Sequence, residues 1–512
     1  MIKLTNWHPK TKLEEDGIKI ARLLKARGFQ AFWVGGLVRN LLLKIDSDNL
    51  DITTDALPEQ VEKILKKGWI TTKAIGKKFG TIVAITKGLP IEITTFRAES
   101  RYSDFRHPDE VKFIRDYIKD AQRRDFRINA LYFDPIEKII FDPTGGLTDL
   151  KNKIIRFVGD PRKRIDEDPL RMLRAVRLLG QFGFSAKGAC LPARQGPASP
   201  ASPSDLPATA PARQADAGVA GGSKALQAGA GRAGWKMEKR SFAAIKIRAK
   251  LLTDVSGERI KMEFDKILKH ENPVKIIKLL DQTGLLKFIF PELVVLKKMY
   301  HKSTRYHLEG SVFDHSLLAF EKVKNNDLDL KYAALLHDIG KNQVIGQKIL
   351  FGETVNSYKG HEPKSADIFK SIADRLKFPK DAKNRIFWAL SKHMDIWDFD
   401  KLSESSRIKL TFNPNFKFLI ELGRCDETAN IQLNKRPVVG WQLGLKYYRK
   451  YLKKKSLIEK LTKGKLLIKI SKIPPGPKLG ALIEEIKLKV FTGEIKNLGD
   501  LKIFLKKYQK ST

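Results

Sequence analysis

The sequence predicts an α/β (α+β) domain at the N-terminal end of the chain, followed by a mostly all-α remainder. Up to about residue 150, short apolar runs of strand length are mixed with amphipathic helical stretches. From Pro169 onward, apolar residues recur at three- and four-residue spacing almost to the end, which is typical of packed helices. A chain of 512 residues is too long for one core, so several domains are expected.

The elements of the first domain follow from the periodicity of apolar residues and from the glycines that interrupt it. In chain order we expect a helix over 13–30, a strand over Gln30–Val34 that stops at Gly35–Gly36, a helix over Leu37–Leu43, a strand near Leu50–Thr53, a helix over Pro58–Lys67, and strands around Thr81–Ile85 and Ile91–Phe96.

The stretch from about Ser185 to Gly234 differs in composition from its surroundings. It is rich in Ala, Pro, Gly and Ser, whereas the text on both sides is rich in Lys, Ile and Phe. Because it offers few large apolar groups to bury, we expect a disordered linker or loop. The helical text on either side would join if it were deleted, so we interpret 185–234 as an insertion within a helical domain.

The charge of the chain indicates a polyanionic partner. Lys and Arg number 97 against 58 acidic residues, a net charge of +39. Such a field favours RNA, with binding that weakens steeply with salt; a Lys-rich genome composition is the alternative. No apolar run approaches the roughly 20 residues needed to cross a bilayer, and no secretion signal is visible. Two cysteines, Cys190 and Cys425, fit a reducing compartment, so a cytoplasmic protein without membrane contact is expected.

The segment VGGLVRN places two glycines between a strand and a helix. Glycines let backbone N–H groups approach a phosphate closely, and the helix N-terminus adds partial positive charge. Arg39 could then reach a triphosphate. A simple turn at Gly35 and Gly36 is the alternative interpretation of the glycines alone.

Two carboxylates follow on expected strands, Asp51 in DNLDITTDA and Glu92 in IEITTFR. Acidic residues on neighbouring strands suit two-metal phosphoryl transfer, because the metals must touch both the attacking hydroxyl and the triphosphate. Strand-edge carboxylates that simply face water remain an equal alternative at this point.

The segment EDPLRMLRAVR carries arginines on one helical face. Arg171, Arg174 and Arg177 are spaced three residues apart, and Asp168 lies one turn before Arg171. An Asp and an Arg at this spacing can offer an acceptor and donors to a base edge, while the other arginines hold phosphates. A surface stripe of ion pairs is the alternative.

Together with RRDFRINAL, DPTGGLTDL and VSGERI, these segments occur in an order that resembles the class II nucleotidyltransferases, namely tRNA CCA-adding enzymes and bacterial poly(A) polymerases. The resemblance covers nearly the whole chain except the insert. It implies Mg²⁺-assisted attack of an RNA 3′-hydroxyl on the α-phosphate of CTP or ATP, with release of pyrophosphate. The implied partners are a tRNA or other RNA 3′ end, CTP and ATP.

The resemblance also implies roles for individual residues. Asp168 and Arg171 would read the Watson–Crick edge of the incoming C or A without a nucleic-acid template, and Arg174 and Arg177 would complete that pocket. The implied catalytic set is Asp51, Asn49 and Glu92, and the other implied nucleotide-binding residues are Gly35, Gly36, Arg39, Arg123, Arg124, Asp125 and Asn129.

Two positions depart from the family pattern. The family shows Asp-x-Asp where this chain has Asn49 before Asp51, and its Gly-Gly-x-Val-Arg-Asp ends here in Asn40. An Asn offers a metal only a carbonyl oxygen, so Mg²⁺ affinity should fall. Asp48 lies at an odd offset from Asp51, which on a regular strand points it to the opposite face unless a bulge redirects it.

A second constellation follows in HLEGSVFDHSLLAF, YAALLHDIGK, KGHEPKSA, LSKHMDIWD and GRCDETA. The pair His337–Asp338 ends an apolar helical run, where an unpaired charge is costly and a metal relieves the cost. The series resembles HD-domain phosphohydrolases. That resemblance implies the core ligands His315, His337, Asp338 and Asp426, with His361 and His393 as further ligands, and a transition metal such as Mn²⁺, Ni²⁺ or Fe.

The expected organisation is therefore a nucleotidyltransferase head (1–150), a helical neck with the insert (151–270), an HD domain (271–430) and a helical tail (431–512). The rival functions are a poly(A) polymerase, or an A-only or CC-only adding enzyme, of the same family. A second rival is an HD phosphohydrolase acting on RNA 2′-phosphate or 2′,3′-cyclic phosphate ends with a weakened head. A non-enzymatic RNA-binding protein is a third.

Overall fold

A computed structural model describes residues 1–73, 80–86, 89–99, 111–183, 234–301, 308–350, 352–431 and 440–511. The chain divides into two compact units, residues 1–248 and 249–512, and each is described by itself. The expected insert at 185–234 lies outside the described residues except for Gly234.

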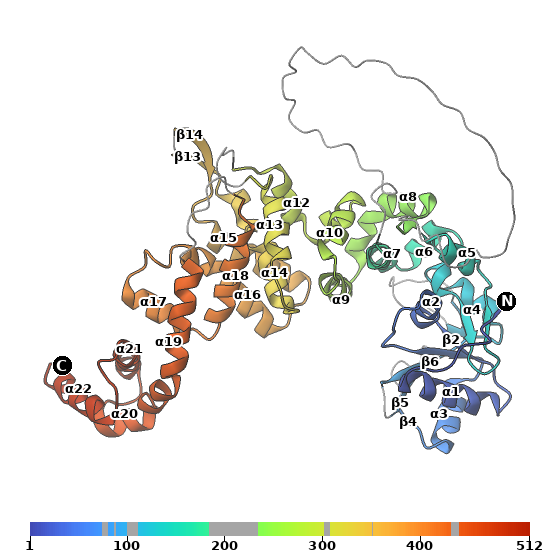
Figure 1. Cartoon of the computed structure of the whole chain (residues 1–512), viewed down its shortest axis with the longest axis horizontal. Helices are drawn as coiled ribbons and strands as arrows, with labels where there is room; N and C mark the ends of the chain where they lie inside the picture. The colour runs from blue at the N-terminus through green and yellow to red at the C-terminus, as the bar shows by residue number, and fades with distance from the viewer. Residues whose placement is uncertain are drawn as a thin grey trace, which may run out of the picture. The chain divides into compact units, whose positions relative to one another are not determined.

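The first unit is built on an eight-stranded sheet in the order β1-β10-β9-β2-β3-β6-β5-β4 (Figure 1). Only the β3–β6 pair is parallel, and the other neighbours are antiparallel. The strands are β1 (Ile2–Lys3), β2 (Ala31–Val34), β3 (Asp51–Thr54), β4 (Thr71–Lys73), β5 (Thr81–Ile85), β6 (Ile91–Thr95), β9 (Tyr132–Asp134) and β10 (Ile139–Phe141), and β7 (Arg97–Glu99) and β8 (Val111–Phe113) form a separate pair.

The two faces of this sheet pack against different cores. Side chains alternate along a strand, so Trp33 of β2 joins the core beneath helices α1 (Lys12–Lys25) and α3 (Pro58–Lys67). Figure 1 shows both helices on that side of the sheet. Its neighbour Phe32 belongs to a second cluster with Tyr132 on the opposite face. This alternation determines which strand residues face away from α1 and α3.

Most of the expected elements of this domain are present within a residue or two of their expected bounds. The first helix is shorter than expected: it ends at Lys25, and Gly28, with a φ of +83°, lies in the turn before β2. The sequence did not predict β1, β4, β9 or β10. These strands have only two or three residues each, too few for a period to be visible.

The rest of the first unit is mainly helical. It comprises α2 (Gly36–Leu43), α4 (Tyr117–Gln122), the 3-10 turn η2 (Arg127–Asn129), α5 (Gly146–Lys151), β11 (Ile154–Ile155), α6 (Pro161–Glu167), α7 (Leu170–Gln181), β12 (Lys236–Met237) and α8 (Lys239–Arg248). The chain resumes after the insert beside the point where it left: the Trp235 N–H donates to the Gly183 carbonyl at 2.9 Å. The strand β12 then pairs in parallel with β11.

The second unit is helical, as expected, with one exception. Its elements are η3 (Ala249–Asp254), α9 (Gly257–Leu268), α10 (Pro273–Gln282), α11 (Leu286–Ile289), α12 (Pro291–Val295), η4 (Leu296–Lys298), α13 (Val312–Glu321), α14 (Leu328–Leu336), η5 (Ile339–Gln343), β13 (Gly346–Leu350), β14 (Glu353–Ser357), α15 (His361–Arg375), α16 (Lys380–Trp397), α17 (Glu404–Thr411), α18 (Phe416–Ala429), α19 (Gly440–Leu461), α20 (Gly464–Ser471), α21 (Pro477–Thr492) and α22 (Leu498–Ser511). The hairpin β13–β14 corrects the expectation of an unbroken helical pattern. Within the described ranges, no helix combines the length and apolar character that a bilayer crossing requires.

Candidate functional sites

The acidic pair of the first unit lies where two strands run in parallel. Asp51 on β3 is in register with Glu92 on β6. Leu50 and Ile52 both belong to the core beneath α1 and α3, so Asp51 and Glu92 face the opposite side of the sheet. The structure therefore brings together two carboxylates that are separated by about forty residues of sequence.

Gly35 fits this site for two reasons. Its φ is +74°, a conformation that disfavours side chains. A Cβ at this position would also lie 3.2 Å from the Oδ2 atom of Asp51. The turn before α2 therefore passes directly beside the carboxylate.

The carboxylate of Asp51 keeps contact with solvent, but surrounding protein atoms limit its hydration. This desolvation raises the pKa of Asp51 to about 6, and repulsion from Glu92 adds to the rise. Arg124 and Arg174 act in the opposite direction. A divalent cation would offset both the lost hydration and the repulsion between the two carboxylates.

Arg39 is buried, with 6% of its surface exposed. Its Nε and Nη2 atoms donate to Oδ1 of Asn40 at 3.1 and 2.8 Å. Its Nη1 atom donates to Oδ1 of Asn129 at 2.6 Å. Asn40, which departs from the family pattern, therefore holds Arg39 through a neutral amide.

A buried aspartate that the sequence did not single out organises the RRDF segment. Asp120 on α4 forms ion pairs with Arg123 at 2.8 Å and with Arg124 at 3.1 Å. The Tyr132 hydroxyl donates to it at 2.5 Å. Burial alone would raise the pKa of Asp120, but Arg124 and Arg123 outweigh it and lower the pKa to about 2. Its place three and four residues before the two arginines is a signal that could have identified it.

Asp125 connects this segment to helix α7. Its Oδ2 atom forms an ion pair with Nη2 of Arg174 at 2.7 Å, and its Oδ1 atom accepts from the Asn129 amide at 3.2 Å. Three residues that the family resemblance assigned to the nucleotide, Asp125, Asn129 and Arg174, are therefore bonded to one another.

Arg171 is held from two sides. Its Nη1 atom forms an ion pair at 2.6 Å with Glu167, which the sequence analysis did not select. Its Nη2 atom donates to the Arg123 carbonyl at 3.3 Å. Asp168 lies between α6 and α7, and its Oδ1 atom accepts from the Leu170 N–H at 3.1 Å.

The arginines act on one another electrostatically. Burial, together with repulsion from Arg177 and Arg174, lowers the pKa of Arg39 to about 10, against attraction from Asp125. A group of arginines that repel one another beside an acidic pair is suited to bind a polyanion with a metal ion. Asn49 is exposed two residues before Asp51, and the structure adds no carboxylate at that position.

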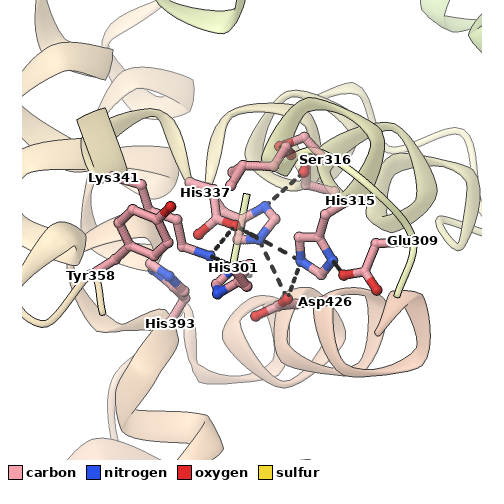
Figure 2. Close-up of polar contacts among 12 residues, drawn as sticks. His301, Glu309, His315, Ser316, His337, Lys341, Tyr358, His393 and Asp426 are labelled. Atoms are coloured by element: carbon pink, nitrogen blue, oxygen red, sulfur yellow. Dashed lines mark hydrogen bonds and ion pairs between the residues drawn. The ribbon is translucent and has the colours of Figure 1, made fainter. Parts of the chain in front are cut away.

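A second constellation is buried in the second unit. It consists of two groups of three residues, and within each group the candidate ligand atoms lie within 4.8 Å of one another. The first group is His315, His337 and Asp426, and the second is Asp338, His361 and His393. Figure 2 shows the rings of His315 and His337 turned toward Asp426. The structure thus brings together all six residues that the HD resemblance implied.

The hydrogen bonds of three histidines orient their Nε2 atoms inward. The Nδ1 atoms of His337, His361 and His393 lie 2.9, 2.8 and 2.7 Å from the backbone carbonyls of residues three positions earlier. A carbonyl can only accept, so Nδ1 carries a proton in each ring, and Nε2 is the atom left to bind a metal once the ring is neutral. The Nε2 atoms of His361 and His393 lie 2.9 Å apart. When both rings are neutral, their Nε2 lone pairs face and repel each other, and a bound cation would remove that repulsion.

The electrostatics of the group also fit a cation. Burial alone would lower the pKa of His337, but Asp338 and Asp426 outweigh it and raise the pKa to about 10. Burial and the neighbouring His361 lower the pKa of His393 to about 3. The two buried carboxylates therefore require positive charge, which Lys341 and a second proton on His337 supply without a metal; a metal ion would take the place of that proton.

Neighbouring residues that the sequence did not select complete the surroundings. The Glu309 carboxylate lies 2.8 Å from Nδ1 of His315, and Trp397 Nε1 donates to Oδ2 of Asp426 at 2.6 Å. Lys341 pairs with Asp338 at 2.7 Å and lies over the Tyr358 ring (Figure 2). A carboxylate that accepts a hydrogen bond from a metal-binding histidine makes that histidine a stronger base, so Glu309 would strengthen His315 as a ligand.

Comparison with known families identifies three segments of the chain. Residues 31–156 match the poly A polymerase head domain, residues 234–296 the probable RNA and SrmB-binding site of polymerase A, and residues 311–411 the HD domain. The matches confirm the resemblance that the motifs predicted.

Among curated proteins, the chain is 34% identical over 275 residues to the CCA-adding enzyme of Geobacillus sp. (strain WCH70), covering 54% of each chain. It is 33% identical over 293 residues to the CCA-adding enzyme of Anoxybacillus flavithermus, covering 57% of this chain and 59% of the relative. The matched regions span little more than half the length of these relatives.

Solved structures show the same fold. The Bacillus stearothermophilus CCA-adding enzyme in complex with CTP superimposes with a TM-score of 0.60 at 23% identity, covering 98% of this chain and 99% of that one. The Thermotoga maritima CCA-adding enzyme complexed with tRNA gives a TM-score of 0.52 at 19% identity, covering 98% and 96%. The expected head, helical neck and HD body are therefore confirmed as a fold.

Proposed function

We propose that this chain, which carries a poly A polymerase head domain, an RNA-binding region and an HD domain, adds C and A to the 3′ ends of tRNA from CTP and ATP. The observation that carries the proposal is the acidic pair Asp51–Glu92, in register on parallel strands and within the field of Arg124 and Arg174. Pyrophosphate leaves when the tRNA 3′-hydroxyl attacks the α-phosphate.

In the head, acidic residues would bind the metal ion, and Arg39 with a backbone N–H group would bind the triphosphate. Asp51 and Glu92 would hold Mg²⁺ with the carbonyl oxygen of Asn49, and the ion would supply positive charge for the triphosphate and the attacking hydroxyl. Arg39 and the backbone N–H of Gly36 bind the triphosphate. The protein's contribution is positioning and charge stabilisation, because phosphoryl transfer needs little covalent help.

The base edge is read at the junction of α6 and α7. Asp168 supplies an acceptor, and Arg171 supplies donors from a guanidinium fixed by Glu167 and the Arg123 carbonyl. A rigid donor and acceptor discriminate bases better than mobile ones, because wrong pairings leave polar groups unsatisfied. Arg174 and Arg177 complete this pocket. Asn49 in place of an aspartate tempers the activity by weakening Mg²⁺ binding.

The test is incubation with a tRNA lacking its CCA end and with CTP alone, ATP alone or both. Extension by two residues with CTP and by a third after ATP is added supports CCA addition. Incorporation of A alone indicates a poly(A) polymerase or an A-adding enzyme, and two C residues without A indicate a CC-adding enzyme.

A matched pair of variants tests the assignment of the metal-binding carboxylate. Asp51→Asn should abolish incorporation, whereas Asp48→Asn should leave it nearly unchanged, because Asp48 lies in the bend before β3 and is not on the strand that pairs with Glu92. Equal loss in both variants would contradict the assignment.

A second activity is favoured by the six buried ligands of the HD domain. We propose that His315, His337, Asp338, Asp426, His361 and His393 bind Mn²⁺, Ni²⁺ or Fe and hydrolyse 2′-phosphate or 2′,3′-cyclic phosphate ends of RNA. Metal analysis of the purified protein, conversion of 2′,3′-cyclic nucleotides to nucleoside monophosphates, and phosphate release from 2′-phosphorylated ends test it, with Asp338→Asn as the inactive variant. Hydrolysis of either substrate without any nucleotide incorporation would instead support the rival function with a weakened head.

The domain boundaries at 150, 270 and 430 and a cytoplasmic location belong to the same proposal. Localisation of the tagged full chain by fractionation tests the location. Limited proteolysis with fragment mapping tests the boundaries.

A further inference from the structure

An aromatic stack lies against the arginine proposed to bind the triphosphate. The Arg39 guanidinium carbon lies 5.1 Å from the centroid of the Phe182 ring. Phe182 in turn stacks on Trp235, with ring centroids 4.4 Å apart and planes at 26°. Trp235 is 5% exposed, so the far side of the stack is fixed in the protein.

The two aromatic residues come from opposite sides of the insert. Phe182 follows α7 directly, and Trp235 precedes β12. The hydrogen bond from the Trp235 N–H to the Gly183 carbonyl joins the two segments at 2.9 Å. A side chain more than fifty residues away in sequence therefore supports the ring that faces Arg39.

Arg39 needs such support because its charge is not neutralised by a bonded carboxylate. Within the described residues, its hydrogen-bond partners are the amide oxygens of Asn40 and Asn129. Amides orient the edges of the guanidinium but supply no negative charge, and they leave part of its donor capacity unused. A π face stabilises a cation without consuming an N–H donor.

We propose that Phe182, backed by Trp235, is a positioning residue that holds the Arg39 guanidinium in the plane required to bind the triphosphate of the incoming nucleotide. This inference rests on the proposed function of the head. The ring fixes the plane of the guanidinium, Asn40 and Asn129 fix its rotation within that plane, and the remaining N–H donors are directed to phosphate oxygens.

The test compares Phe182→Leu, which keeps an apolar side chain but removes the π face, with Phe182→Tyr, which keeps the ring. Phe182→Leu should raise KM for both CTP and ATP about fivefold with little change in kcat, as expected for loss of a partly desolvated cation–π contact. Phe182→Tyr should restore the wild-type KM. The same weakening should appear in the Kd for inorganic tripolyphosphate, measured by calorimetry.

Trp7→Leu is the control for lost stability. Trp7 packs edge-on against Trp33 and Phe133 in the head core, so this variant lowers Tm without touching the proposed stack. Trp235→Leu is a second variant in case Phe182→Leu does not fold, and it should raise KM in the same direction.

The outcomes separate this inference from the proposed function. If the wild type binds neither tripolyphosphate nor nucleotide, the proposed function of the head fails. If the wild type binds both and Phe182→Leu binds them equally well, the positioning role is overturned. A KM rise of the same size in Trp7→Leu would also overturn it, because the effect would then reflect stability alone.

Discussion

Replacement of Asp120 by Asn should destabilise the first unit and disable the RRDF segment at the same time. Asp120 is fully buried and is the common partner of Arg123, Arg124 and the Tyr132 hydroxyl. An amide keeps the shape of the side chain but removes the negative charge. Arg124 would then remain buried without a carboxylate, which is the costly way to break an ion pair.

The magnitude follows from the pKa of Asp120, which the two arginines lower from 3.8 to about 2. Each pKa unit corresponds to about 1.4 kcal/mol, so the charged form of Asp120 contributes about 2 kcal/mol to the free energy of unfolding. The unpaired arginine left in the variant adds to this loss. We therefore expect a decrease of about 3 kcal/mol at neutral pH.

The sign of the pH dependence follows from the lowered pKa. The contribution is complete above pH 3.8, the unfolded value, and disappears as pH falls toward 2. The wild type should therefore lose its advantage over Asp120→Asn between about pH 4 and pH 2. Above pH 5 the difference between the two proteins should be constant.

The assay is urea unfolding of the full chain at several pH values, with the transition of the first unit followed separately because the two units need not unfold together. Asp116→Asn is the matched control, since Asp116 caps the same helix from an exposed position and Asn caps nearly as well. An Asp120→Asn protein as stable as the control at pH 7 would refute the reasoning.

Three further predictions concern the metals and the RNA. Asn49→Asp adds a carboxylate ligand, so it should raise nucleotide incorporation and lower the Mg²⁺ concentration required about tenfold, as measured in Mg²⁺ titrations with CTP and ATP. No change would mean that another group, such as Asp48, already completes the site. Chelation should lower the Tm of the second unit, and added Mn²⁺ or Ni²⁺ should restore it in the wild type but not in His361→Ala, as measured by calorimetry with metal analysis. The affinity for tRNA should fall steeply between low and physiological salt, and a flat salt dependence in filter binding would argue against an RNA partner for the +39 charge.

The sequence determined the parts of this protein whose chemistry is local. A pair of glycines between a strand and a helix, an aspartate at the start of a strand and arginines at three-residue spacing are visible in short stretches of sequence, so Gly35, Asp51 and Arg174 could be selected directly. The same holds for His337 and Asp338, because two polar residues that end an apolar helix need a compensating partner. The longer helices and strands were predictable because their periods repeat often enough to be recognised.

The tertiary structure decided which of these residues are partners. The motifs led us to expect Asp51 and Glu92 on neighbouring strands, but only the register between β3 and β6 shows that they lie side by side. Glu309 reaches His315 from outside any helix, and Trp235 reaches Phe182 from the far side of the insert. Such contacts depend on how distant segments pack. The residue types that can bind phosphate or metal are therefore specified locally, whereas the partners that orient them and shift their pKa values exist only in the folded chain.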